Sequence, residues 1–149
     1  IIGKGTEDGV NKGAGVITGK GAVGIIDAVS RNYSYARSFK NHEMNISARL
    51  GEEGAVGPMS WDGLSSDGAI LREIPLHVEF EKGDTVYTSG YSSIFPPDIP
   101  LGTTGEAKIV NGATYDIEIS LFEDFGALRY VTIVENIGEE EIKKLEEGL

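Results

Sequence analysis

The fold of this chain is decided by residues 83–102, GDTVYTSGYSSIFPPDIPLG. A short strand-like run, Thr85–Thr88, ends at Gly90, and a second run begins after the paired prolines Pro96 and Pro97. Each proline fixes the backbone dihedral φ and lacks an N–H donor, so this segment is predicted to be a rigid loop outside any strand ladder. The apolar side chains on such a loop belong either in a protein core or on a docking surface.

On both sides of this loop, apolar and polar residues alternate. Residues 113–121 show the alternation most clearly, and residues 76–80 repeat it. A period of two with one charged face is typical of half-buried antiparallel strands. Asn111-Gly112 lies between two such runs and predicts a hairpin, because both central positions of that turn need positive φ. Further strand candidates are residues 22–29, 35–39, 45–49, 54–59, 69–73, 85–88, 105–110 and 130–134. The pattern predicts an all-β fold with two small β-barrels packed together.

The strand candidates also suggest how the two barrels share the chain. Residues 31–99 contain enough strand runs to close a small barrel, whereas each flank contains too few. We therefore expect residues 1–30 plus 100–137 to form a discontinuous first barrel, with a second barrel, residues 31–99, inserted into it, rather than two barrels in sequence. Residues 138–149 are expected to be a tail, in which Glu139–Gly148 is either a short helix or an extended end.

Composition excludes several classes of function. The 149 residues are 40% hydrophobic, so the chain can bury a core. Its formal net charge of −11 argues against a nucleic-acid partner, because phosphate binding requires clustered Lys and Arg. The sequence has no cysteine, which excludes a disulfide framework, a thiol nucleophile and a Cys-ligated metal. No run reaches the ~18–20 apolar residues of a membrane helix.

Motifs that would carry chemistry fail on their surroundings. Gly19–Gly24 matches the dinucleotide-binding pattern by letter, but β-branched residues follow where a helix should begin. His42 lacks the second histidine of a zinc-protease motif, which would fall at Ile46. Ser65 lacks the flanking glycines of an oxyanion hole. We therefore expect no catalytic residue, no cofactor and no metal, and a chymotrypsin-like hydrolase is the weakest alternative.

The order and spacing of the glycine turns and strands resemble the family of the rod shape-determining protein MreC. The resemblance extends from Gly5 to Val134, and its most specific part is residues 82–102. It implies a pair of small β-barrels that act as a scaffold at the periplasmic face of the inner membrane and have no enzymatic activity. It also implies partners, namely the MreB cytoskeleton, MreD, the penicillin-binding proteins that synthesise peptidoglycan, and further copies in a dimer or filament. The family's N-terminal membrane anchor and coiled coil are missing, so we expect an excised, soluble ectodomain.

Under this resemblance, exposed aromatic and apolar side chains are expected to dock onto a penicillin-binding protein or a second copy. The candidates are Tyr33, Trp61, Tyr91, Ile94 and Phe95. Apolar side chains on rigid loops lose little entropy on binding, which favours this role. For Phe95, the alternative of a core plug stays open. Residues 80–86 also resemble the β-domain of a periplasmic efflux-pump adaptor, although the helical hairpin of such adaptors is missing.

Overall fold

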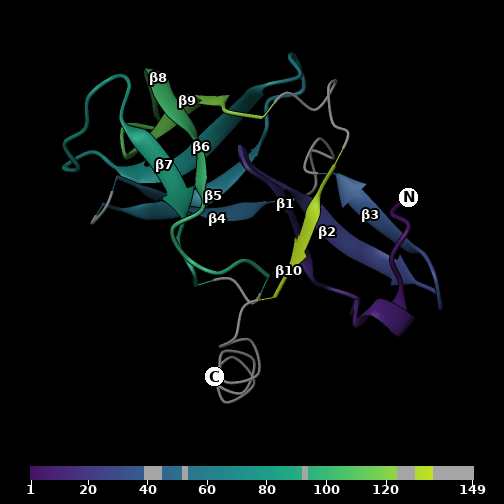
Figure 1. The fold of residues 1–149 in the computed structure, drawn as a ribbon. Coiled ribbons are helices and arrows are strands. Elements are labelled where there is room, and N and C mark those ends of the chain that lie inside the picture. Colours follow the sequence, from purple (N-terminus) through teal and green to yellow (C-terminus); the bar gives the residue numbers. More distant parts are fainter. Residues whose placement is uncertain (39–44, 52–53, 92–93, 124–129, 136–149) are drawn as a thin grey trace.

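The computed structural model of this chain describes residues 1–38, 45–51, 54–91, 94–123 and 130–135. These residues form ten strands and one turn of 3-10 helix, η1 (Thr6–Asp8), which confirms the all-β class. The strands divide into a closed barrel and a smaller sheet that lie side by side (Figure 1). The expected tail, residues 138–149, and its helix lie outside the described residues.

Six strands close the barrel in the order β4-β5-β6-β9-β8-β7, and every neighbouring pair is antiparallel. Their bounds are β4 (Ile46–Leu50), β5 (Val56–Trp61), β6 (Gly68–Pro75), β7 (Thr85–Thr88), β8 (Pro100–Val110) and β9 (Thr114–Leu121). Each strand contributes at least one buried side chain to the core, including Ala48, Met59, Leu71, Val86, Leu101 and Ile117. Burying one such large apolar side chain contributes about 1.5–3 kcal/mol, so this core is the main source of the barrel's stability.

Four strands form the smaller sheet in the order β10-β1-β2-β3. Their bounds are β1 (Gly15–Thr18), β2 (Gly21–Val29), β3 (Ser34–Ser38) and β10 (Thr132–Val134). Side chains of one face, including Ile17 and Ala22, pack with the barrel core. The other face forms a second core, in which Val16, Val23 and Ile26 pack with Val10 and Ala14 from the N-terminal segment.

The strand pairing differs from the expected organisation. Residues 100–121 were expected to pair with residues 1–30, but β8 and β9 close the barrel by pairing with β7 and β6. Residues 34–38 were expected in the second barrel, but β3 pairs with β2 and forms an edge of the sheet. From the described residues after β9, β10 returns to pair with β1. The expected first barrel is therefore a four-stranded sheet, because β8 and β9 form a hairpin with each other and pair with β7 and β6 of the barrel.

Two local predictions have opposite outcomes. Asn111 and Gly112 have φ of 52° and 64°, so the hairpin between β8 and β9 is confirmed. Residues 76–80 were predicted to be a strand but form a loop instead. Pro75 ends β6 and its carbonyl accepts a hydrogen bond from the N–H of Val78. The ring of Phe80 packs edge-on against that of Tyr115, with 5.4 Å between the ring centroids. The apolar residues Val78 and Phe80 of this loop therefore pack against the barrel core without forming a strand.

The loop between β7 and β8 joins the barrel to the sheet. Thr88 holds the loop, because its hydroxyl donates to the carbonyl of Pro96 at 2.8 Å and accepts from the N–H of Ile99 at 2.9 Å. Phe95 is only 2% exposed and its ring lies against Gly15 of β1, where a Cβ would come within 2.7 Å of the ring. A second link lies at the other end of β1, where the hydroxyl of Thr18 donates to the carboxylate of buried Glu123.

Candidate interaction surface

Burial separates the five predicted interaction residues into two groups. Phe95 is a core plug, so its predicted place on a docking surface is wrong. Ile94 is partly buried and packs against the same core. The ring of Phe95 fits the junction between barrel and sheet because β1 has a glycine, Gly15, where the ring and the backbone carbonyl of Ile94 approach. The rigid loop predicted from the prolines exists, but its apolar side chains face inward.

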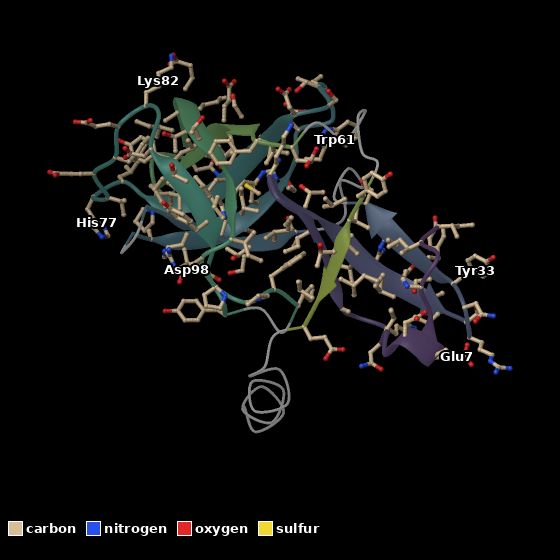
Figure 2. All side chains as sticks on the ribbon, in the orientation of Figure 1. Glu7, Tyr33, Trp61, His77, Lys82 and Asp98 are labelled. Atoms are coloured by element: carbon tan, nitrogen blue, oxygen red, sulfur yellow. The ribbon has the colours of Figure 1, made fainter. Side chains whose placement is uncertain are left out.

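Trp61 and Tyr91 lie on different parts of the barrel. Trp61 is half-buried at the end of β5, and its indole N–H donates to the carbonyl of Ser65 at 2.6 Å. Tyr91 is 73% exposed at the start of the loop, where its N–H donates to the hydroxyl of Ser89 at 3.1 Å. Tyr33 belongs to the sheet, far from Trp61 in Figure 2. The five residues therefore do not form one patch.

Tyr33 lies in the connection between β2 and β3, and the N-terminal segment braces this hairpin. The N–H groups of Thr6 and Glu7 donate to the carbonyls of Ser30 and Arg31 at 2.9 and 3.1 Å. The guanidinium of Arg31 donates to the carboxylate of Glu7 at 2.8 Å. Within the hairpin, the N–H of Ser30 donates to the carbonyl of Tyr33 at 2.8 Å. These contacts fix the backbone that carries the Tyr33 side chain.

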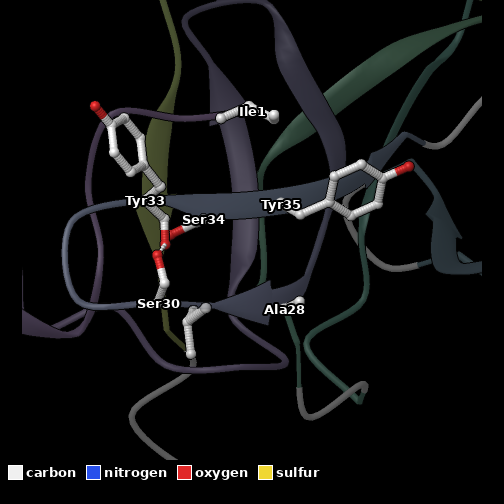
Figure 3. A pocket seen from close by; sticks show the side chains of 7 residues that line it. Ile1, Ala28, Ser30, Tyr33, Ser34 and Tyr35 are labelled. Carbon is white, nitrogen blue, oxygen red and sulfur yellow. Dashed lines mark hydrogen bonds between the residues drawn. The ribbon is translucent and has the colours of Figure 1, made fainter.

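Beside Tyr33 lies a shallow apolar hollow, which we call the tyrosine pocket. It has a volume of about 240 Å³ and is lined by Ile1, Ala28, Val29, Ser30, Tyr33, Ser34 and Tyr35. Figure 3 shows the rings of Tyr33 and Tyr35 on either side of Ser34, pointing away from the strand. Their exposed fractions are 59% and 54%, although both are large apolar groups. Clustered exposed aromatic side chains of this kind are typical of protein–protein interfaces.

The sheet and the barrel differ in charge. Residues 1–38 contain five Lys or Arg and three Asp or Glu. Residues 46–121 contain four Lys or Arg and twelve Asp or Glu. Arg37 follows Tyr35 on the same face of β3 and lies 3.9 Å from Asp27, with both side chains nearly half exposed. The tyrosine pocket therefore lies in the most basic part of an acidic chain. On the barrel, a hydrogen bond between the ammonium group of Lys82 and the carboxylate of Glu106 raises the lysine pKa and lowers the glutamate pKa.

The described side chains do not assemble a catalytic triad around Ser65, the serine whose surroundings already argued against catalysis. Ser65 has Asp62 as its neighbour, with 3.4 Å between the hydroxyl and the carboxylate. Asp62 is occupied in shaping the turn, since it accepts from the N–H groups of Leu64 and Ser65. His77 lies on the opposite side of the barrel from this turn (Figure 2). His42 lies outside the described residues.

Comparison with known proteins settles the family. The family model described as "Rod shape-determining protein MreC, barrel core" matches residues 1–135. The chain belongs to the MreC family. A curated relative, the cell shape-determining protein MreC of Listeria monocytogenes, is 28% identical over 144 residues, which cover 93% of this chain and 48% of the relative. This MreC-family chain thus spans about half the length of the curated relatives it matches.

Solved structures show the same fold. The crystal structure of MreC from Pseudomonas aeruginosa matches with a TM-score of 0.79 and 22% identity, covering 89% of this chain and 85% of that chain. The major periplasmic domain of the cell shape-determining filament MreC matches with a TM-score of 0.74 and 19% identity, covering 90% and 85%. A complex between penicillin-binding protein PBP2 and MreC from Helicobacter pylori matches with a TM-score of 0.68 and 17% identity, covering 83% and 78%.

Tyr35 is the residue of the tyrosine pocket that the sequence analysis missed. The sequence pattern indicates its position, because Tyr33, Tyr35 and Arg37 are two residues apart and so share one face of a strand. No sequence pattern indicates that Ile1 lines the pocket. It depends on the pairing of Ile2 with Ser34, which brings the N-terminal segment alongside β3.

Proposed function

We propose that this chain is a non-enzymatic scaffold for cell shape that binds a penicillin-binding protein through the tyrosine pocket. Membership of a family named for cell-shape determination supports the scaffold role. The similar fold of an MreC found in complex with PBP2 supports the choice of partner. The pocket supplies the surface, because it combines exposed aromatic rings with a backbone held by the N-terminal turn.

Family membership also supports a proposal for the wider role. In this proposal the chain acts in the periplasm and connects the MreB cytoskeleton and MreD to peptidoglycan synthesis, and it also associates with further copies of itself. The description of a similar structure as a periplasmic domain supports the location. No helix among the described residues is long and apolar enough to cross a membrane.

The observation that carries the proposal is the exposure of two tyrosines on one rigid hairpin. Tyrosine supplies a large contact area at low entropic cost and is enriched among the residues that dominate binding energy. Truncating such a residue typically costs about 2 kcal/mol or more of binding free energy, which is roughly a 30-fold loss of affinity.

Binding of a purified penicillin-binding protein ectodomain from the same organism, measured by biolayer interferometry, tests the proposal. The double variant Tyr33→Ala/Tyr35→Ala should lose at least about 30-fold in affinity. Tyr91→Ala is the matched control, because Tyr91 is equally aromatic, more exposed and on the barrel. Loss of binding with Tyr91→Ala but not with the double variant would refute the assignment of the surface.

A further inference from the structure

We propose that the tyrosine pocket recognises an extended, proline-containing segment of its partner, flanked by acidic residues. This inference rests on the proposed function and specifies the chemistry of the same site. The volume of the hollow gives the first argument. Sites for drug-sized ligands occupy about 300–1,000 Å³, so a hollow of about 240 Å³ suits one or two side chains of a partner protein rather than a small molecule.

The backbone of β3 gives the second argument. At the edge of the sheet beside the pocket, an extended partner could add only by pairing with the outward N–H and C=O groups of β3. Those of Ser34 are already bonded to Ile2, with distances of 3.0 Å from the Ser34 N–H to the Ile2 carbonyl and 2.8 Å from the Ile2 N–H to the Ser34 carbonyl. Beside the two tyrosines, strand addition is therefore blocked, and a partner must be held by side chains.

The side chains that remain fit a polyproline II segment. Such segments dock into aromatic-lined grooves, and their backbone carbonyls stay free to accept hydrogen bonds. Neither phenol hydroxyl of Tyr33 and Tyr35 has a hydrogen-bond partner among the residues that the structure describes. Both hydroxyls point outward in Figure 3, so they are placed to donate to a partner's carbonyls while the rings and Ile1 contact its proline side chains.

The basic side chains near the pocket favour acidic residues on either side of the partner's prolines. Along the chain, Arg31 lies two residues before Tyr33, and Arg37 lies two residues after Tyr35. Each guanidinium pairs with one carboxylate, that of Glu7 or Asp27, but the arginine side chains stay 78% and 44% exposed and can still contact an acidic partner. An acidic residue on each side of the partner's prolines would face these guanidinium groups, which adds an attraction that salt weakens.

The experiment is an NMR titration of the ¹⁵N-labelled chain with the capped peptide Glu-Pro-Pro-Leu-Pro-Glu. We expect amide shifts confined to residues 29–37 and the adjoining N-terminal residues 1–3, and a dissociation constant of about 0.1–1 mM. Replacing the prolines by alanine, or the glutamates by lysine, should weaken binding at least several-fold. Tyr35→Phe should weaken it a few-fold by removing one hydroxyl, and Tyr33→Ala should weaken it about tenfold or more. Tyr91→Ala should leave it unchanged.

Absence of shifts at residues 29–37, or equal binding of the alanine-substituted peptide, would overturn the inference. The proposed function is tested separately by the penicillin-binding protein itself. If that protein binds through Tyr33 and Tyr35 while the peptide does not, the proposed function stands and the proline inference is wrong. If the peptide binds and that protein does not, the proposed partner is wrong and the pocket serves a different proline-containing one.

Discussion

Replacing Phe95 by alanine tests whether the loop between β7 and β8 joins the barrel to the sheet. Phe95 is 2% exposed and belongs to the core that includes Ala22 of the sheet and Leu101 of the barrel. Truncating a buried phenylalanine to alanine costs about 3–5 kcal/mol of unfolding free energy, through lost burial and the remaining cavity. That loss is a large fraction of the ~5–15 kcal/mol of a typical domain. Urea unfolding followed by the fluorescence of Trp61, the single tryptophan, measures it.

A double-mutant cycle with Gly15 makes this prediction specific to the contact. Gly15→Ala should cost about 1–3 kcal/mol alone, because its Cβ would lie 2.7 Å from the Phe95 ring. In the Phe95→Ala background the same change should cost much less, since the ring is gone. Tyr91→Ala, on the same loop but exposed, should change stability by less than about 0.5 kcal/mol. Additive effects of the two substitutions, or a loss below about 1 kcal/mol for Phe95→Ala, would refute the reasoning.

Three further predictions concern single contacts. Thr88→Val should cost about 1–3 kcal/mol in urea unfolding, because Pro96 and Ile99 each lose a hydrogen-bond partner, and an unchanged midpoint would contradict the loop's bracing. Thr18→Val should destabilise the chain by about 1–2 kcal/mol by leaving Glu123 without the Thr18 hydroxyl, whereas the exposed Thr132→Val should not. Lys82→Ala should raise the lowered pKa of Glu106 toward its ordinary value in an NMR titration. Because the pKa of Glu106 is lowered in the folded state, its pair with Lys82 contributes to folding stability at pH values above the ordinary glutamate pKa. That contribution is lost as the pH falls through the lowered pKa. A Glu106 pKa that does not change in Lys82→Ala would exclude the pair.

The sequence located most of the strands but not their pairing partners. Alternation and turn residues located β7 and the Asn111-Gly112 hairpin because both depend on local chemistry. Which strands close the barrel depends on contacts between distant segments, and β8 joins β7 and β9 where pairing with the N-terminal strands was expected. Alternation alone also could not distinguish a strand from the loop of residues 76–80, whose apolar side chains cover the barrel end.

The candidate site likewise combines features that the local sequence predicts with features that depend on contacts between distant segments. Aromatic residues on rigid segments were identified from sequence, but burial decides whether such a residue binds a partner or fills a core. Phe95 is buried because Gly15, which is 80 positions away in the chain, leaves room for its ring across the junction, and no local pattern contains this contact. Tyr33 is exposed because it lies at the hairpin of an edge strand.

The central claim is that the tyrosine pocket is the surface on which a penicillin-binding protein docks. Hydrogen–deuterium exchange of the full chain with and without that protein measures this surface directly. We predict slowed exchange at residues 29–37 and unchanged exchange in the barrel loop of residues 61–67. Protection of the barrel loop, with residues 29–37 unchanged in a saturated complex, would contradict the claim.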